Sequence, residues 1–204
     1  MWYKKYGWKT NPFVIKPSPV IINFESEKEK LLNYINSGDI CFLVGKPGSG
    51  KSTLTKLLGY PYISAGDFAR AFLPAKAARG MFVDQRRIAQ LISSSAKTFN
   101  NERVFILEGT PLSKVSLKEY EKNNIVFCLA IYLDASDELV INRLNKRGRS
   151  TDIKYLSRRL LSFKRVTEKV IDDFRERGIL ITKEANVSPN KIVRDLKNII
   201  KNLK

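Results

Sequence analysis

The sequence contains no histidine, and this absence removes several kinds of catalytic site at once. Acid–base chemistry on an imidazole and the Ser-His-Asp triad require histidine, and the usual zinc sites require histidine or a cysteine cluster. The chain has two cysteines, Cys41 and Cys128, and each lies inside an apolar run. We expect both to be small buried thiols on strands, with no metal site and no disulfide.

Long apolar runs are also absent. No stretch reaches the roughly 18 apolar residues that suggest a membrane span. The basic start of the chain leads into no apolar segment of a signal peptide. We therefore expect no membrane partner and a cytoplasmic location. The length of 204 residues suits one domain with one good core.

Acidic residues are few relative to basic ones, since 20 Asp and Glu stand against 37 Lys and Arg, a net charge of +17. Such an excess favours polyanionic partners, because lysine and arginine neutralise phosphates and release counterions. Two polyanions stay open: a nucleic acid, or the clustered phosphates of nucleotides. The alternative interpretation is that the lysines keep a small domain soluble.

The first part of the chain differs in composition from the rest. Residues 2–24 are rich in aromatic residues and proline, which resist helix and central strand, so an extended arm is expected. Residues 25–37 have helical spacing, and Gly38 is a stop signal. We therefore divide the chain into an N-terminal arm and helix over residues 1–38 and a second unit over residues 39–204.

In the second unit, short apolar runs alternate with segments of helical spacing. The predicted strands are 40–44, 104–108, 125–133 and 179–182, and the predicted helices are 51–58, 112–123, 137–146, 153–177 and 189–203. Strands that are apolar throughout are typical of a parallel sheet buried on both faces. The predicted fold class is α/β, with a parallel sheet sandwiched by helices.

A glycine-rich segment stands directly after the first predicted strand. It reads Gly45-Lys46-Pro47-Gly48-Ser49-Gly50-Lys51-Ser52 and fits the P-loop pattern G-x-x-x-x-G-K-[ST]. Glycines let backbone N–H groups turn toward phosphates, and the following helix adds its positive end. Lys51 can reach the terminal phosphates, and the Ser52 hydroxyl can bind Mg²⁺. The residues that we assign to ATP or phosphate binding are Gly45, Pro47, Gly48, Ser49, Gly50, Lys51, Ser52 and Thr53.

From residue 40 to about residue 200 the sequence resembles the adenylate kinase family of nucleoside monophosphate kinases. The segments that carry the resemblance are the P-loop, residues 62–70 with 80–84, residues 104–111, and residues 132–138, 143–149 and 158–178. The resemblance implies a P-loop kinase domain over residues 39–204, with a monophosphate-binding-like insertion at about 66–103 and a short lid at about 147–153. It also implies transfer of the γ-phosphoryl of Mg-ATP to a nucleoside monophosphate or related acceptor, with ATP as substrate and Mg²⁺ as cofactor.

The resemblance further implies roles for cations near the transferred phosphate. The residues that it makes catalytic are Lys51, Arg147, Arg149 and Arg159, while Arg143 lies against the ATP base. Positioned cations suit this chemistry, because phosphoryl transfer spreads negative charge over the equatorial oxygens. The alternative is a basic, solvated helix face, which suits Arg158, Lys164 and Lys169 better than the matched positions.

On the acceptor side the resemblance implies Ser64, Gly66, Arg70 and Gly109, with Arg70 gripping the acceptor phosphate. Glu108, at the end of a predicted strand, would hold the hydration shell of the Mg²⁺ ion that Ser52 binds. The plainer interpretations are that Arg70 is a solvated surface arginine and that Glu108 caps a strand.

The departures from the family fall on the acceptor side. Ala65 stands where the family has threonine, Leu112 where it has arginine, and Ser116 near the glutamine that reads the adenine of the acceptor. The cations that could replace the missing arginine are Lys76, Arg79, Arg86 and Arg87. AMP is therefore not assigned as the acceptor.

A second hypothesis is a P-loop ATPase associated with nucleic acid, which uses ATP binding or hydrolysis as a switch. The net charge favours it, and residues 6–13 faintly resemble the opening of AAA-type and origin-binding ATPases. Those ATPases need an acidic pair at the end of the Walker B strand and a helical lid domain, and neither is visible. A polynucleotide end as acceptor, or a nucleotide-binding protein that has lost transfer, also stays open. The residues decide neither the acceptor nor the oligomeric state.

Overall fold

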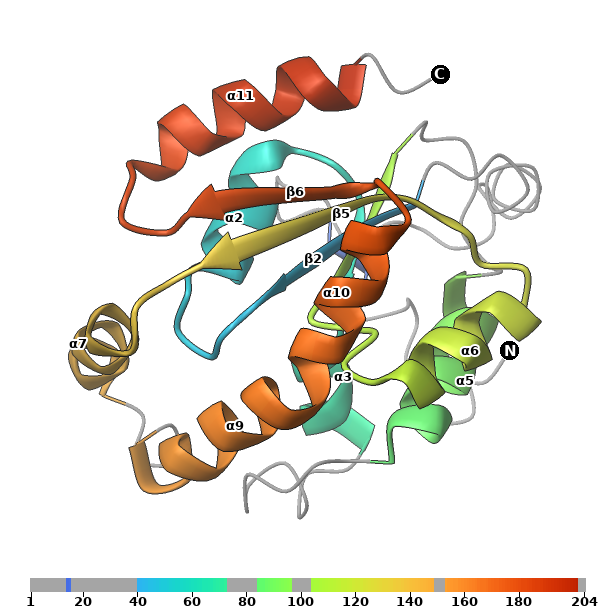
Figure 1. Cartoon of the computed structure of the whole chain (residues 1–204), viewed down its shortest axis with the longest axis horizontal. Helices are drawn as coiled ribbons and strands as arrows, with labels where there is room; N and C mark the ends of the chain where they lie inside the picture. Colours follow the sequence, from blue (N-terminus) through green and yellow to red (C-terminus); the bar gives the residue numbers. More distant parts are fainter. Residues whose placement is uncertain (1–13, 16–39, 73–83, 97–103, 149–152, 202–204) are drawn as a thin grey trace.

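The computed structural model describes residues 14–15, 40–72, 84–96, 104–148 and 153–201 (Figure 1). The predicted N-terminal arm and its helix lie almost wholly outside these residues. Part of the predicted insertion and most of the predicted lid lie outside them as well.

One six-stranded sheet organises this part of the chain, in the order β1-β3-β4-β2-β5-β6. The strands are β1 Val14–Ile15, β2 Ile40–Gly45, β3 Tyr62–Ser64, β4 Phe105–Glu108, β5 Phe127–Asp134 and β6 Leu180–Glu184. Strands β3, β4, β2, β5 and β6 pair in parallel, and β1 pairs antiparallel with β3 at the edge. The predicted α/β fold with a parallel sheet is confirmed.

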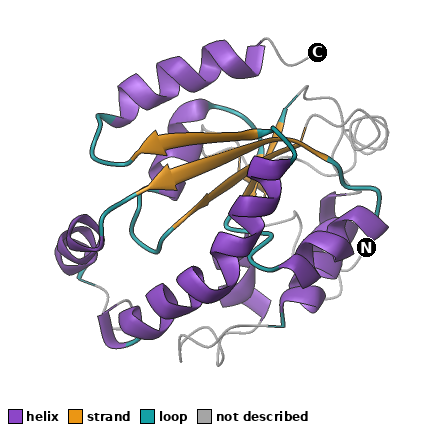
Figure 2. Cartoon of the chain, viewed as in Figure 1, coloured by secondary structure: helices purple, strands orange, loops and turns teal. Residues whose placement is uncertain are grey.

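Helices cover both faces of the sheet (Figure 2). They are α2 Lys51–Leu58, α3 Ala65–Phe72, α5 Gln85–Ala96, α6 Lys114–Lys122, α7 Asp137–Arg147, α9 Leu156–Ser162, α10 Glu168–Glu176 and α11 Pro189–Lys201. Between α9 and α10 the chain makes a π-helical turn, η2, over Phe163–Thr167. The sequence predicted one uniform helix here. The sequence analysis also missed β3, α3 and α5. A strand of three residues has a weak periodic pattern, and short helices depend more on tertiary packing than on their local sequence.

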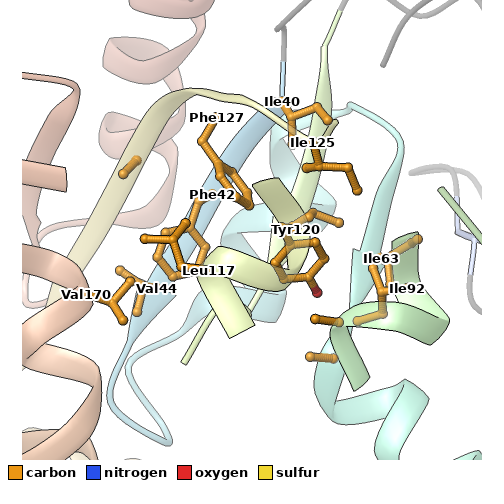
Figure 3. Close-up of a cluster of buried hydrophobic side chains, with 14 of the residues drawn as sticks. Ile40, Phe42, Val44, Ile63, Ile92, Leu117, Tyr120, Ile125, Phe127 and Val170 are labelled. Carbon is orange, nitrogen blue, oxygen red and sulfur yellow. The ribbon is translucent and has the colours of Figure 1, made fainter. Parts of the chain in front are cut away.

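The side chains of β2 show how the two faces arise. Alternate residues of a strand point to opposite faces, and here both faces are apolar and fully buried. Ile40, Phe42 and Val44 pack into a cluster with residues of α3, α5, α6 and α10. Cys41 and Leu43 pack on the other face with residues of α2, α7 and α11. Figure 3 shows the first cluster, with Phe127 close to Phe42 and Tyr120. The ring of Phe127 packs edge-on against the rings of Phe42, Tyr120 and Phe174.

Both cysteines lie on strands, as predicted, Cys41 on β2 and Cys128 on β5. Cys41 is buried, but Cys128 is only partly buried, and its Sγ contacts the carbonyl oxygen of Ile40 at 3.5 Å. Within the described ranges, no helix is both long enough and apolar enough to cross a membrane.

Candidate active site

A glycine-rich turn joins β2 to α2 and contains the P-loop predicted at residues 45–52. The backbone of Gly48 has a φ of 79°, and a Cβ there would lie 2.8 Å from Cγ of Leu144. A Cβ on Gly45 would lie 2.6 Å from the carbonyl oxygen of Leu133. Glycine is required at both positions, because a side chain would push the turn away from its neighbours.

The N-terminus of α2 has no side-chain cap. Gly50 is the N-cap residue, and the first turn of α2 holds no acidic residue. The N–H groups of that turn therefore carry an uncompensated partial positive charge, which suits a phosphate. The other residues assigned to phosphate binding line this turn: Pro47 is half-buried, Ser49 is buried, and Ser52 and Thr53 are exposed.

Lys51 is the first residue of α2, and its ammonium group turns back toward the loop. Nζ donates hydrogen bonds to the carbonyl oxygens of Gly45 and Lys46, both at 2.8 Å. Burial lowers the Lys51 pKa to about 8, Glu108 opposes that shift, and the positive charge of Arg159 adds to it. Lys51, Glu108 and Arg159 therefore lie within electrostatic reach of one another.

Strand β4 ends at Glu108, level with Leu43 of β2 and Ser64 of β3. Oε1 of Glu108 accepts a hydrogen bond from Oγ of Ser52 at 2.8 Å. Oε2 is buried and has no hydrogen-bond partner in the part of the chain that the structure describes. Burial raises the pKa of Glu108, while Lys51 and the Ser52 hydroxyl act against that rise. A buried carboxylate oxygen of this kind is costly unless a cation or water meets it.

The predicted acceptor residues begin at the end of β3. Ser64 is buried, and its Oγ accepts a hydrogen bond from the N–H of Asp67 at 3.3 Å. Gly66 lies beside Arg70, since a Cβ on Gly66 would be 3.5 Å from a guanidinium nitrogen. Arg70 is exposed and forms an ion pair with Asp67. Both charges of this pair act on the pKa of Glu108, so the acceptor side lies near the end of β4.

The loop of residues 109–113, which we call the β4–α6 loop, follows Glu108 directly. Gly109 donates its N–H to the carbonyl oxygen of Leu43 at 2.8 Å, which fixes the start of the loop against β2. Oγ1 of Thr110 lies 2.9 Å from the hydroxyl of Tyr120 in α6. The predicted acceptor residue Gly109 is therefore held between β2 and the carboxylate.

The predicted arginines approach the P-loop from α7 and α9. Arg143 donates to the carbonyl oxygens of Ser49 and Ala185, both at 2.7 Å, and so ties the loop to the segment after β6. Arg147, the last residue of α7, follows Arg143 by one helical turn and shares its side of the helix. Arg149 lies outside the described residues.

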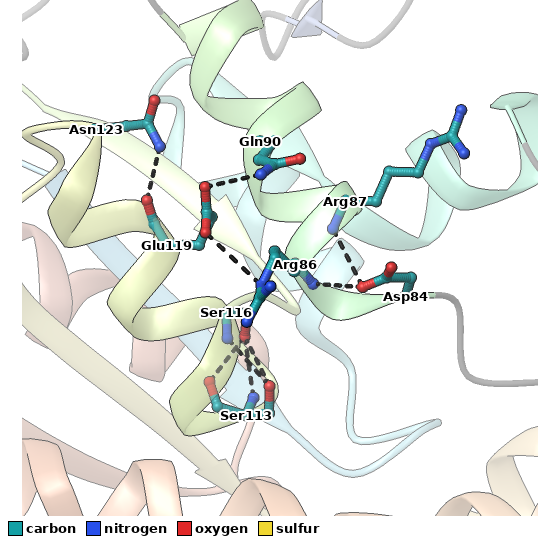
Figure 4. A network of polar contacts seen from close by, with 8 residues as sticks. All are labelled: Asp84, Arg86, Arg87, Gln90, Ser113, Ser116, Glu119 and Asn123. Carbon is teal, nitrogen blue, oxygen red and sulfur yellow. Dashed lines mark hydrogen bonds and ion pairs between the residues drawn. The ribbon is translucent and has the colours of Figure 1, made fainter.

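Ser116, near the position of the adenine-reading glutamine, is committed to the start of α6 (Figure 4). It is fully buried. Its Oγ donates to the carbonyl oxygen of Ser113 at 2.8 Å and accepts from the N–H of Ser113 at 3.1 Å. Together the two serines form a capping box. The Ser116 hydroxyl therefore serves the helix rather than a ligand.

Two of the four cations considered as replacements for an arginine at position 112 are described. Nε of Arg86 lies 4.0 Å from a carboxylate oxygen of Glu119 in α6. Arg87 is exposed, and its N–H donates to Asp84 at the start of α5 at 3.3 Å (Figure 4). Neither contact joins these cations to the P-loop. The other two, Lys76 and Arg79, lie outside the described residues.

Sequence reasoning missed two ion pairs that border the site. Nζ of Lys46, inside the P-loop, lies 2.6 Å from Oδ1 of Asp137 at the start of α7. These residues are 91 positions apart, so no local pattern signals their contact. The pair of Asp67 and Arg70 did have a signal, because residues three apart on a helix are neighbours.

Comparisons with known proteins agree with this geometry. The model of the family described as an AAA domain matches residues 44–157, more than half of the chain. Adenylate kinase isoenzyme 1 of Bos taurus is 29% identical over 161 residues, covering 69% of this chain and 83% of the relative. The Rattus norvegicus isoenzyme 1 is 25% identical over 190 residues, covering 83% and 98%. UMP-CMP kinase 1 of Oryza sativa subsp. japonica is 27% identical over 184 residues, covering 80% and 74%.

Proposed function

The chain belongs to the AAA domain family, and on that premise we propose that it is an ATP-dependent phosphotransferase that moves the γ-phosphoryl of ATP to a nucleoside monophosphate or related acceptor. The resemblance to adenylate kinases is confirmed by the relatives, which are nucleotide kinases by name. The organisation that goes with this proposal is an arm over residues 1–38 and a kinase-like domain over residues 39–204, with the insertion at 66–103 and the lid at 147–153.

One observation carries the proposal above the others. The ends of β2 and β4 bring a phosphate-binding turn, a partly buried lysine and a buried carboxylate together, and the charge of Arg159 on α9 acts on that lysine. Phosphoryl transfer needs positioning and positive charge around the transferred group rather than a dedicated base. Lys51 and Arg159 supply that positive charge. Arg70 adds a further cation close enough to act on the pKa of Glu108.

Binding of ATP would place its phosphates on the P-loop and the N-terminus of α2. Lys51 would exchange its hydrogen bonds to Gly45 and Lys46 for the terminal phosphates. Arg159, with Arg147 and Arg149, would stabilise the charge that develops on the transferred group. Arg143 holds the loop itself in place, through its hydrogen bond to Ser49.

The residues at the end of β4 fit a magnesium ion. Mg²⁺ prefers oxygen donors and is commonly held by one or two carboxylates, water and the phosphates of the substrate. Ser52 Oγ and Glu108 supply such oxygens side by side, and Oε2 of Glu108 is the buried atom without a partner. Ser52 would bind the ion and Glu108 would hold its water. The ion would supply positive charge that stabilises the phosphoryl group during transfer.

Replacing Glu108 with glutamine tests this assignment. The amide keeps the shape of the side chain and an acceptor for the Ser52 hydroxyl, but removes the charge that orders the hydration of Mg²⁺. We expect the Mg²⁺ concentration at half-maximal activity to rise about tenfold or more, with an unchanged or higher melting temperature, because a buried charge is relieved. The measurement is a Mg²⁺ titration of activity at saturating ATP. An unchanged titration would remove Glu108 from the metal site.

The Lys51 pKa of about 8 predicts how ATP affinity depends on pH. Phosphates favour the charged ammonium, so the pKa of bound Lys51 lies above that of free Lys51. Affinity should be constant below pH 8 and fall by up to about tenfold per pH unit above it, with one proton taken up on binding. Calorimetric titrations from pH 7 to 9.5 in two buffers of different ionisation enthalpy measure both quantities. Constant affinity without proton uptake would contradict the role of Lys51.

Two positions on the acceptor side bear on which monophosphate the site accepts. Leu112 supplies no charge, and Ser116 is fully buried in the capping box of α6. Specificity for adenine therefore has no support from these two positions, and we keep the acceptor as a nucleoside monophosphate or a related compound. Arg70, Ser64, Gly66 and Gly109 remain its proposed contacts.

The relatives favour the kinase over the nucleic-acid-associated ATPase. The end of β4 agrees with this preference, because it carries Leu107 and Glu108 rather than an acidic pair. Binding to nucleic acid stays a prediction from the net charge of +17.

The experiment is an ADP-release assay with Mg-ATP, alone and with each ribo- and deoxynucleoside monophosphate. Strong stimulation by one monophosphate supports the proposal and names the acceptor. Slow release that no monophosphate changes contradicts it, and DNA and RNA are then the next additions.

A further inference from the structure

We propose that Thr167 is a positioning residue, which ties the helix carrying Arg159 to the β4–α6 loop beside the acceptor site. This inference rests on the function proposed above. Oγ1 of Thr167 donates a hydrogen bond to the carbonyl oxygen of Leu112 at 3.2 Å, across 55 positions of sequence.

The β4–α6 loop is held at several points along its length. Gly109 bonds to β2, Thr110 to Tyr120 of α6, and Ser113 to Ser116 at the start of α6. These contacts come from the elements that the loop itself connects or borders. The contact at Leu112 differs, because it comes from the long helical segment that also carries Arg159.

The π-helical turn is what brings Thr167 to this position. An α-helix turns about 100° per residue, so eight residues would place Arg159 and Thr167 about 80° apart. In η2 the N–H of Glu168 bonds to the carbonyl oxygen of Phe163, five residues back. The extra residue in that turn reduces the rotation between Arg159 and Thr167 by about 100°. The two side chains therefore leave the helix in directions that differ by only about 20° around its axis. One face thus presents a cation to Lys51 and a hydroxyl to the loop.

The packing around the π turn keeps it in place. Thr167 is 1% exposed and Phe163 is 4% exposed. The ring of Phe163 stacks on Tyr132 of β5, with ring centroids 6.2 Å apart. Phe163 also packs in the core cluster with Val170 and Phe174, the buried residues that follow in α10. The turn is therefore anchored in the sheet, and the Thr167 hydroxyl has a fixed position from which to hold Leu112.

The hydrogen bond from Thr167 links the two sides of the proposed reaction site. Glu108 contacts the P-loop through Ser52 and directly precedes the β4–α6 loop, while the charge of Arg159 acts on Lys51. Thr167 joins the loop to the helix of Arg159. Without it, the acceptor side and the transfer cation can move independently, so the acceptor is less often in line with the transferred group.

Replacing Thr167 with valine removes the hydroxyl and nearly keeps the volume. We expect kcat/KM for the acceptor to fall roughly three- to tenfold, the net effect of one hydrogen bond. ATP affinity should be unchanged, because the P-loop contacts of Lys51 are untouched. Thr167→Ser keeps the hydroxyl and should restore most of the loss. Amide hydrogen exchange over residues 109–113 should be faster in the valine variant and near wild type in the serine variant.

The outcomes separate this inference from the function on which it rests. If the wild-type protein transfers phosphate to no monophosphate, the proposed function is wrong. Hydrogen exchange then still tests whether Thr167 holds the β4–α6 loop. Unchanged exchange in Thr167→Val overturns the tie whatever the activity. A lower melting temperature with unchanged KM for the acceptor and unchanged exchange would show an ordinary core threonine. Equal losses in the valine and serine variants would also overturn the proposal, since they would trace the effect to packing.

Discussion

Replacing Lys51 with methionine is expected to lower phosphoryl transfer by at least about a thousandfold, because it removes a positioned cation from the transferred group. Methionine keeps the length of the side chain but has no ammonium group. The hydrogen bonds to Gly45 and Lys46 are lost as well, so the loop loses an internal support. The measurement is the rate of ADP release with the best acceptor, together with the melting temperature.

The matched control is Lys56→Met. Lys56 lies in the last turn of the same helix and is exposed, so its charge is far along α2 from the loop. We expect its activity to stay within about twofold of wild type, as for most surface substitutions. A Lys51→Met variant that keeps a tenth or more of the wild-type rate while folding normally would contradict the assignment of the P-loop as the reacting site.

The second large effect is expected at Arg159. Its charge acts on Lys51 inside the site, and it stands on α9, one residue after Arg158. Replacing Arg159 with methionine should lower kcat by roughly a hundred- to a thousandfold, since a positioned cation stabilises the transition state more than the bound substrate. ATP affinity should change much less. Steady-state kinetics with varied ATP and acceptor give both quantities.

Arg158→Met is the control that the chain itself offers. It removes the same group from the preceding position, where Arg158 is exposed and Arg159 is partly buried. Its kcat should stay within about twofold of wild type. If the two variants lost activity equally, the effect would come from the overall charge of the helix. Arg159 would then have no specific role in stabilising the transition state.

The parts of the fold that the sequence predicted well have local causes. The apolar run of β2 and the glycines of the P-loop are each readable within a few residues, because burial on both faces and a phosphate-binding turn impose strict residue types. Helix α6 begins at a serine cap and α7 follows Ser136, whose Oγ accepts from the N–H of Leu139 at 3.2 Å. Such caps are visible in sequence.

The parts that were missed depend on contacts between distant segments. The pair of Lys46 and Asp137 and the bond from Thr167 to Leu112 join residues 91 and 55 positions apart. The π turn follows from how Phe163 and Thr167 pack, so the helical spacing of residues 153–177 predicted a plain helix. The carboxylate of Glu108 was predicted, but its unpartnered oxygen is visible only once the strands are assembled.

The most direct test of the central claim follows the γ-phosphoryl group itself. ATP labelled on the γ-phosphate is incubated with the protein, Mg²⁺ and the monophosphate that most stimulates ADP release, and the products are separated. The proposed function predicts that the label moves to the monophosphate, giving a labelled diphosphate, and that Lys51→Met abolishes this product. Label that appears as inorganic phosphate, with none on the acceptor, would contradict the phosphotransferase and favour an ATPase.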